Sequence, residues 1–289
     1  MHTLTSAAQV TAVSKEAHRA GKRVGFVPTM GALHEGHLSL IRTARAQSEV
    51  VIASVFVNPA QFGPNEDFSH YPRQPERDSA MLAAEKTDYL FMPSTEEMYP
   101  PGASTWVTVE GLSDKLDGRS RPGHFRGVTT VVAKLFNIVQ PDFAFFGQKD
   151  AAQVAIIGKI VRDLNFDVRI VACPIVREAD GLAMSSRNAY LTPEQRKQAT
   201  VLYRSLMRVQ SLVDQGESSA ARLHVAGTQV VAEGPAVKLD YFEIVERNTL
   251  DPIPDVSQGA LVAVAAYLGN TRLIDNIVIT GTGSSMGPS

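Results

Sequence analysis

Two apolar runs without polar alternation, residues 24–27 and 50–57, flank a stretch of helical spacing at about 36–47. A strand that is covered on both faces needs such a run, because neither of its faces meets water. The order strand, helix, strand predicts a parallel βαβ unit. The order continues with a helix at about 127–139, a strand at 142–146, a helix to about 163 and a strand at 167–172. We therefore expect an α/β fold with a Rossmann-like, doubly wound parallel sheet.

The pattern changes after residue 175. A loop of polar and small residues, 176–188, precedes Thr192, which can cap a helix that has Pro193 in its first turn. Two helices should follow, and then three alternating segments that predict an antiparallel sheet, with Gly269-Asn270 as a hairpin turn. The alternating segments are residues 237–245, 261–268 and 273–279. We predict an N-terminal domain at 1–175, a smaller C-terminal α+β domain at 176–281 and a disordered tail at 282–289.

Composition and charge exclude several classes of protein. A formal net charge of -2 provides no global attraction to nucleic acid or to anionic lipid. The first 25 residues contain no central apolar block, which argues against a signal peptide and a membrane span. The one cysteine, Cys173, excludes an internal disulfide and is expected to be an inert thiol buried in a strand. The cytoplasm is the expected location, with no nucleic-acid or membrane partner.

The junction between the first strand and its helix carries two histidines, His34 and His37, together with Gly31 and Gly36. Unpaired N–H groups and partial positive charge at a helix N-terminus favour an anion, and two imidazoles add N–H donors. A capping loop with surface histidines and a metal-binding pair are the alternatives. The zinc-protease pattern H-E-x-x-H fails because Leu38 occupies its last position. The junction is therefore predicted to bind phosphate.

Further candidates follow other strands of the predicted sheet. Lys149 could meet a triphosphate as a point charge, or it could be an ordinary surface lysine. Asp150 could cap the next helix or orient Lys149 or a metal-bound nucleotide, and Gln153 shares its helix face. Asn58 and Gln61 offer amides for hydroxyl and carboxylate oxygens, although each could simply cap local backbone.

Two weaker candidates complete the set. In the loop Met184-Ser185-Ser186-Arg187-Asn188, the Arg187 guanidinium can bind phosphate oxygens and the hydroxyls can supplement it, unless the loop is an ordinary linker. Such a loop could close over a substrate. Asp78 could coordinate Mg²⁺ or lie on a solvated helix.

Four segments together resemble the pantothenate synthetase (pantoate–β-alanine ligase) family. They are PTMGALHEGHLSL from Pro28, VFVNPAQFGPNEDFSHYPR from Val55, HFRGVTTVVAKLFNIVQPDFAFFGQKDAAQ from His124 and READGLAMSSRNAYL from Arg177. The resemblance implies a nucleotidyltransferase-type Rossmann fold and two reaction steps. Pantoate and ATP, with Mg²⁺, would give pantoyl adenylate and pyrophosphate, and β-alanine would then displace AMP to form pantothenate.

The resemblance also implies roles for individual residues. His37 matches the family's proton donor, and His34, Lys149 and Arg187 join it in the expected catalytic set. Gln61, Gln153 and, less surely, Asn58 would contact pantoate, Gln61 would also lie near β-alanine, and Asp78 would be a possible magnesium ligand. The expected ATP contacts are Met30, Gly31, Ala32, Leu33, His34, Glu35, Gly36, His37, Gly147, Gln148, Lys149, Asp150, Val176, Met184, Ser185, Ser186 and Arg187. A homodimer formed through the N-terminal domain is implied as well.

Two other functions stay open at this point. Another nucleotidyltransferase with the same histidine loop could act on a phosphorylated small molecule. It would need more basic residues, because the substrate carries a phosphate in addition to those of the nucleotide. Gln61 and Gln153 suit a neutral diol and a single carboxylate better. A noncatalytic nucleotide-binding module is the third possibility, and it would bind ATP without turnover.

Overall fold

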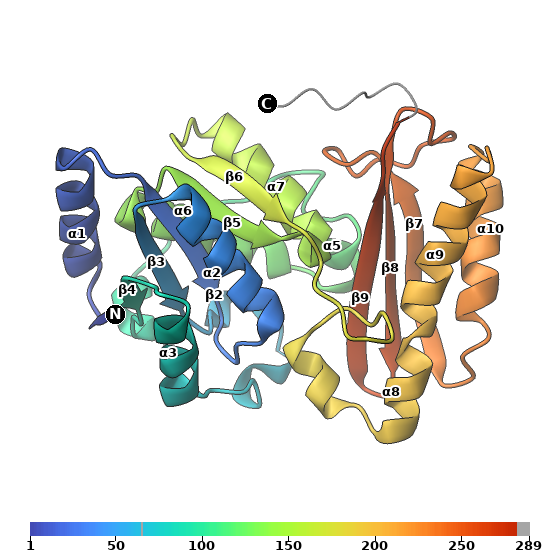
Figure 1. Ribbon diagram of the computed structural model, residues 1–289, viewed down its shortest axis with the longest axis horizontal. Coiled ribbons are helices and arrows are strands. Elements are labelled where there is room, and N and C mark those ends of the chain that lie inside the picture. The colour runs from blue at the N-terminus through green and yellow to red at the C-terminus, as the bar shows by residue number, and fades with distance from the viewer. Residues whose placement is uncertain (65, 282–289) are drawn as a thin grey trace. The chain divides into compact units, whose positions relative to one another are not determined.

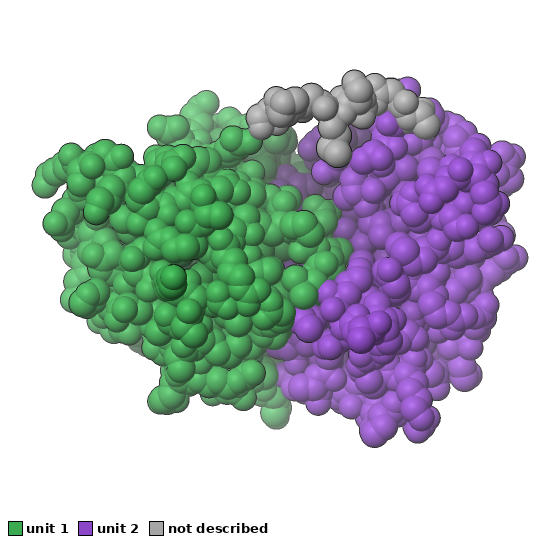
Figure 2. All heavy atoms as spheres, viewed as in Figure 1, with its two compact units in different colours: residues 1–148, 156–176 green, residues 149–155, 177–289 purple. Residues whose placement is uncertain are grey.

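A computed structural model describes residues 1–64 and 66–281. The chain forms two compact units, which Figure 2 distinguishes by colour. Unit 1 comprises residues 1–148 and 156–176, and unit 2 comprises residues 149–155 and 177–289. The predicted disordered tail at 282–289 lies outside the described residues.

Unit 1 is built on a parallel sheet of six strands in the order β1-β4-β3-β2-β5-β6 (Figure 1). The strands are β1 (His2–Leu4), β2 (Val24–Thr29), β3 (Val50–Val55), β4 (Tyr89–Phe91), β5 (Phe143–Gly147) and β6 (Arg169–Cys173). All of its strand pairs are parallel, so the predicted doubly wound sheet is confirmed. The carboxyl ends of β2, β3 and β5 therefore meet at one edge. Strand β3 ends at Val55, whereas the apolar run predicted a strand to residue 57. The strand stops earlier because Asn58 begins a turn, in which its side chain accepts a hydrogen bond from the N–H of Ala60.

Helices connect and cover these strands. They are α1 (Ala7–Arg19), α2 (Glu35–Gln47), α3 (Pro75–Ala84), α4 (Thr95–Met98), α5 (Asp117–Ser120), α6 (His124–Val139) and α7 (Ala151–Asp163), with short 3-10 turns η1 (Pro59–Gln61), η2 (Asp67–Ser69) and η3 (Gln148–Asp150). The apolar core against α2 includes Val27, Ile41, Val51 and Phe145, all of which are fully buried. Burial at this level stabilises each of the larger side chains by about 1.5–3 kcal/mol relative to water.

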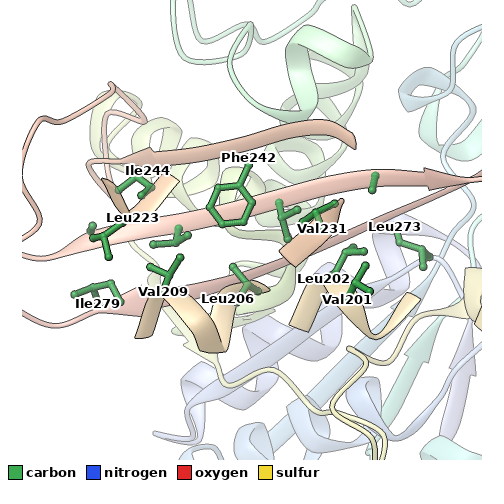
Figure 3. Packing of buried hydrophobic residues seen from close by; sticks show 14 of the residues in the cluster. Val201, Leu202, Leu206, Val209, Leu223, Val231, Phe242, Ile244, Leu273 and Ile279 are labelled. Atoms are coloured by element: carbon green, nitrogen blue, oxygen red, sulfur yellow. The ribbon is translucent and has the colours of Figure 1, made fainter. Parts of the chain in front are cut away.

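Unit 2 contains an antiparallel sheet in the order β7-β8-β9. Its strands are β7 (Val237–Val245), β8 (Ala260–Leu268) and β9 (Thr271–Ile279), and its helical segments are η4 (Ser186–Tyr190), α8 (Pro193–Ala199), α9 (Val201–Asp214) and α10 (Ala220–Val231). Leu206 and Val209 of α9 and Leu223 of α10 pack with Phe242 and Ile244 of β7 in one apolar cluster (Figure 3). The smaller α+β fold is therefore confirmed.

Local signals in unit 2 act as the sequence predicts. Thr192 accepts a hydrogen bond from the N–H of Gln195, and the Gln195 side chain accepts from the N–H of Thr192, which completes a capping box. Leu268 pairs with Thr271, so the two residues between them form the tight hairpin turn. The first of these, Gly269, has φ of 60°, a value that favours glycine.

The division into units differs from the predicted boundary between residues 175 and 176. The break follows Val176, and residues 149–155 group with unit 2. A hydrogen bond of 2.9 Å from Asn276 Nδ2 to the Lys149 carbonyl ties this short segment to β9. Among the described helices, none is long and apolar enough to cross a membrane.

Candidate active site

The loop between β2 and α2 has an unusual backbone. Gly31 and Ala32 both have positive φ, 80° and 51°, and the second value is uncommon for a residue with a side chain. Thr29 begins the turn, because its hydroxyl donates to the Ser54 carbonyl at 2.8 Å and accepts from the N–H of Gly31 at 3.2 Å. The loop is thus tied to the end of β3 before α2 begins.

Asp78, on α3, anchors this loop from the other side. Its two carboxylate oxygens accept the N–H groups of Ala32 and Leu33, each at 2.9 Å. The residue is 1% exposed, so the solvated alternative for it is wrong. A Cβ on Gly31 would lie 2.9 Å from Asp78 Oδ2 and 3.0 Å from Val55, which explains the glycine. Asp78 therefore fixes a strained loop by charge-assisted hydrogen bonds.

The two histidines cap α2 through their own side chains. His34 is the N-cap residue, and its Nδ1 accepts from the N–H of Gly36 at 3.2 Å. The Nδ1 of His37 accepts from the N–H of His34 at 3.3 Å, and the two ring centroids are 4.1 Å apart. An Nδ1 that accepts carries no proton, so each neutral ring has its proton on Nε2. The cap contacts therefore fix the tautomer and the orientation of both rings.

This cap changes how the junction can attract an anion. The sequence suggests a cradle of unpaired backbone N–H groups, but those of residues 31, 32, 33, 34 and 36 donate within the protein. The features of the junction that still favour an anion are the partial positive charge of the helix end and the two imidazoles that lie there. The histidines are thus both caps and candidate ligand contacts.

A buried amide pair lies beside the first residue of the loop. Asn58 is 1% exposed and Gln61 is 8% exposed, and Gln61 Nε2 donates to Met30 Sδ at 3.0 Å. The turn that carries them packs tightly on α6, since a Cβ on Gly127 would lie 2.1 Å from the Ala60 carbonyl oxygen. Unit 1 therefore brings two of the predicted amides together with the predicted ATP loop.

His124 holds the backbone of Gln61 in place. Its Nδ1 lies 2.9 Å from the Gln61 carbonyl oxygen, and its Nε2 lies 3.0 Å from Arg121 Nη1. Burial, with the charge of Arg121, lowers the pKa of His124 to about 4. Since Arg121 can only donate, Nε2 accepts and Nδ1–H donates to the carbonyl. Arg121 in turn forms an ion pair of 2.7 Å with Glu66, so the turn has a charged support.

Unit 2 carries a second group of candidates. The side chain of Lys149 is 21% exposed, and its Nζ lies 3.6 Å from Asp150 Oδ1. Its carbonyl accepts from Asn276, whose neighbour Asp275 is 2% exposed. Asp275 accepts two hydrogen bonds from Arg177, at 2.6 and 3.0 Å. Burial raises the pKa of this carboxyl, although the bonds and charge of Arg177 act to lower it. Strand β9 thus supports the Lys149 turn.

Arg177 also shapes the start of the predicted phosphate loop. It donates to the Gly181 carbonyl at 3.0 Å, and its guanidinium lies 4.4 Å from the ring centroid of Tyr203. Ser185 then caps η4 by accepting from the N–H of Arg187. The other predicted ATP contacts of unit 2, Met184 and Ser186, lie in the same stretch.

The remaining candidates take the positions that the fold gives them. Gly147 ends β5 and Gln148 opens η3, both in unit 1, and Val176 is the last residue of that unit. Gln153 lies on the first turns of α7, in the segment grouped with unit 2.

In the described part of the chain, no group of three or more His, Cys, Asp or Glu side chains could hold a metal ion. Burial raises the pKa of the Cys173 thiol, and this residue is 2% exposed in β6.

Sequence reasoning missed several supporting residues. Arg177 was visible only as part of a quoted motif, and no pattern indicated the partners that it finds in β9. No pattern indicated the groups that surround the buried amide pair either. The missed residues are Tyr99, Arg121, His124, Arg177, Asp275 and Asn276.

Comparison with known proteins agrees with this architecture over the whole chain. The family model of pantoate-beta-alanine ligase matches residues 2–278. A pantothenate synthetase of Koribacter versatilis is 61% identical over 288 residues, covering 100% of this chain and 99% of the relative. One of Thermotoga neapolitana is 54% identical over 279 residues, covering 96% of this chain and 100% of the relative.

Solved structures give the same result. The crystal structure of pantothenate synthetase from Thermus thermophilus superposes with a TM-score of 0.91 at 48% identity, covering 96% of this chain and 99% of that one. A pantoate-beta-alanine ligase from Francisella tularensis, described as complexed with beta-gamma ATP and beta-alanine, has a TM-score of 0.78 at 34% identity, with 96% and 97% covered. By sequence and by fold, the chain belongs to the pantoate-β-alanine ligase family.

Proposed function

We propose that this protein condenses pantoate with β-alanine to form pantothenate, using ATP and passing through pantoyl adenylate. One observation carries the proposal: a histidine pair that caps α2 and a buried amide pair that contacts Met30 are built around the same loop. The first pair suits a phosphate, and the second suits a small polar acid. Family membership and the ATP and β-alanine named for the Francisella tularensis relative support the same reaction.

In the first step, a pantoate carboxylate oxygen attacks the α-phosphorus of ATP, and the bond to pyrophosphate breaks. Negative charge then builds on the departing pyrophosphate, so donors that are already in place lower the barrier. We assign this role to His34, His37, Lys149 and Arg187. The fixed Nδ1 acceptors keep both imidazoles oriented, so that no reorganisation is needed as charge develops.

In the second step, the amine of β-alanine attacks the acyl carbon of the adenylate, AMP leaves as the carbon–oxygen bond breaks, and solvent takes the proton that the amine loses. Gln61 and Gln153 are proposed to hold pantoate, with Gln61 also near β-alanine. Asn58 would act on pantoate through Gln61, because its Nδ2 donates to Gln61 Oε1 at 3.1 Å.

Magnesium is proposed to enter with the phosphates of ATP. Mg²⁺ keeps several waters and is usually bound by substrate phosphates with one or two carboxylates. Asp150 suits a contact to such a hydrated ion, since its side chain is 47% exposed and lies beside Lys149. Asp78 suits it poorly, because both of its oxygens already accept loop N–H groups. We therefore assign Asp78 to the loop and not to the metal.

The test is an omission assay with purified protein and Mg-ATP. AMP and pyrophosphate should accumulate in multiple turnovers only when pantoate and β-alanine are both present. Equal turnover with a phosphorylated acceptor would favour a different nucleotidyltransferase. ATP binding without AMP formation under any condition would indicate a noncatalytic module.

We also propose a homodimer that forms through unit 1 and acts in the cytoplasm. Residues 103–108 form a largely exposed segment of this unit outside its helices and strands, and Trp106 within it is 42% exposed. An exposed segment with a large aromatic side chain suits contact with a second copy. Light scattering should give about twice the 31.3 kDa chain mass. Trp106→Glu should shift the population towards monomer, and a monomeric unmodified protein would contradict the proposal.

A further inference from the structure

Asn58 has a fully satisfied side chain in a position that water barely reaches. Its Oδ1 accepts from the Tyr99 hydroxyl at 2.9 Å and from the N–H of Ala60 at 3.2 Å. Its Nδ2 donates to Gln61 Oε1 and to the Gly127 carbonyl, both at 3.1 Å. An amide has two donor hydrogens and one oxygen with two lone pairs, so all four bonds are made.

These partners allow one orientation of the Asn58 amide. Rotating it by 180° would turn its NH₂ towards the N–H of Ala60 and its oxygen towards the Gly127 carbonyl. Both contacts would then repel, and buried groups would lose their partners. The Tyr99 hydroxyl donates to the oxygen in this orientation and adds a fourth bond that holds the amide in place.

The orientation passes on to Gln61. Since Asn58 Nδ2 is a donor, Gln61 must turn its oxygen towards Asn58 and its NH₂ away from it. Within the described residues, the acceptor that Gln61 Nε2 meets is Met30 Sδ, at 3.0 Å. A thioether is a weak acceptor, so an oxygen of an incoming carboxylate or hydroxyl can replace it at little cost. Gln61 is thus set to donate.

Tyr99 is held in a largely buried position. Burial raises the pKa of its hydroxyl to about 12. Its ring stacks on Trp106 and packs near Phe56, with centroids 6.5 and 6.4 Å away. The ring is therefore held by apolar contacts that a phenylalanine would keep.

We propose that Tyr99 is a positioning residue for the reaction: its hydroxyl holds in place the Asn58 amide, whose backbone partners set its orientation, so that Gln61 presents N–H donors to the oxygens of pantoate. The inference rests on the proposed function, in which Gln61 contacts this substrate. Tyr99 itself acts through Asn58 and is not a catalytic residue.

The test is Tyr99→Phe, alone and combined with Gln61→Ala. Loss of one hydrogen bond that holds Asn58 against Gln61 should raise the apparent KM for pantoate about threefold to tenfold. The apparent KM for ATP and the melting temperature should stay near the wild-type values, because the ring contacts remain. On the Gln61→Ala background, Tyr99→Phe should have no further effect on the pantoate KM, since the group that it orients is gone.

A matched control is Tyr89→Phe, which removes a hydroxyl from β4 of the same unit, where the ring packs on His2. Its pantoate KM should equal that of the wild type. Wild-type pantoate kinetics in Tyr99→Phe, or an effect that simply adds to that of Gln61→Ala, would overturn the positioning role. An unchanged pantoate KM in Gln61→Ala would overturn it too, by removing the substrate contact. Failure of the proposed function looks different, because the unmodified protein would then release no AMP.

Discussion

Replacing His37 with asparagine is expected to lower turnover by about 10²- to 10³-fold, the usual cost of losing one preorganised donor to developing charge. An asparagine Oδ1 can take the place of Nδ1 and accept from the N–H of His34, which now bonds to His37 at 3.3 Å. The side chain is too short to replace the Nε2–H donor. The cap should therefore survive while the catalytic donor is lost. Steady-state release of AMP measures the first effect, and thermal unfolding measures the second.

Two further variants separate the cap from the chemistry. His37→Ala removes both functions and should lose stability as well as turnover. Ser39→Ala removes a hydroxyl that donates to the Gly36 carbonyl at 2.8 Å on the same turn of α2, and it should keep its turnover. Near-normal turnover in His37→Asn would show that His37 only caps the helix.

Replacing Asp78 with alanine should be the most damaging change outside the histidine pair. It leaves the buried N–H groups of Ala32 and Leu33 without acceptors, at a cost of about 1–3 kcal/mol for each. Ala32 would also lose the contact that holds its positive φ. Because a displacement of about 1 Å in a catalytic group can cost 10²-fold, we expect turnover to fall by roughly that factor. Urea unfolding and AMP release test the two effects.

The control for this variant is Asp142→Ala. Asp142 also accepts a backbone N–H, from Val24 at 2.6 Å, but it does so at the start of β2 and not at its carboxyl end. Its loss should lower the free energy of unfolding and leave turnover within about twofold of wild type. If both variants lose the same turnover for the same loss in free energy of unfolding, the activity of Asp78→Ala does not depend on the loop in particular.

The fold could be predicted where the sequence pattern is long or continuous. The run of β3 gives a direct signal, because burial on both faces calls for apolar residues along the strand. Strand β8 was expected to alternate, but it is buried at eight of its nine positions. Strands β1 and β4 were not predicted. Each has three residues, too few for any period to show, and each is a strand because a neighbour in the sheet pairs with it.

The contacts of the candidate site residues could not be predicted from the sequence. A histidine is not among the usual N-cap residues, so its use as a cap in α2 has no sequence signal. Asp78 is 46 and 45 positions from the two N–H groups that it binds, and Tyr99 is 41 positions from Asn58. Such pairings depend on how the elements pack, so they cannot be predicted from one sequence without the fold.

The bond from Asn276 to the Lys149 carbonyl has a consequence for how the protein is made. It joins positions that are 127 residues apart, and its donor lies on the last strand that the structure describes. During synthesis, the turn that carries Lys149 leaves the ribosome long before the strand that supports it. The Lys149 turn therefore gains its support only after residue 276 has been synthesised. A nascent chain can form the parallel sheet of unit 1 before this support exists.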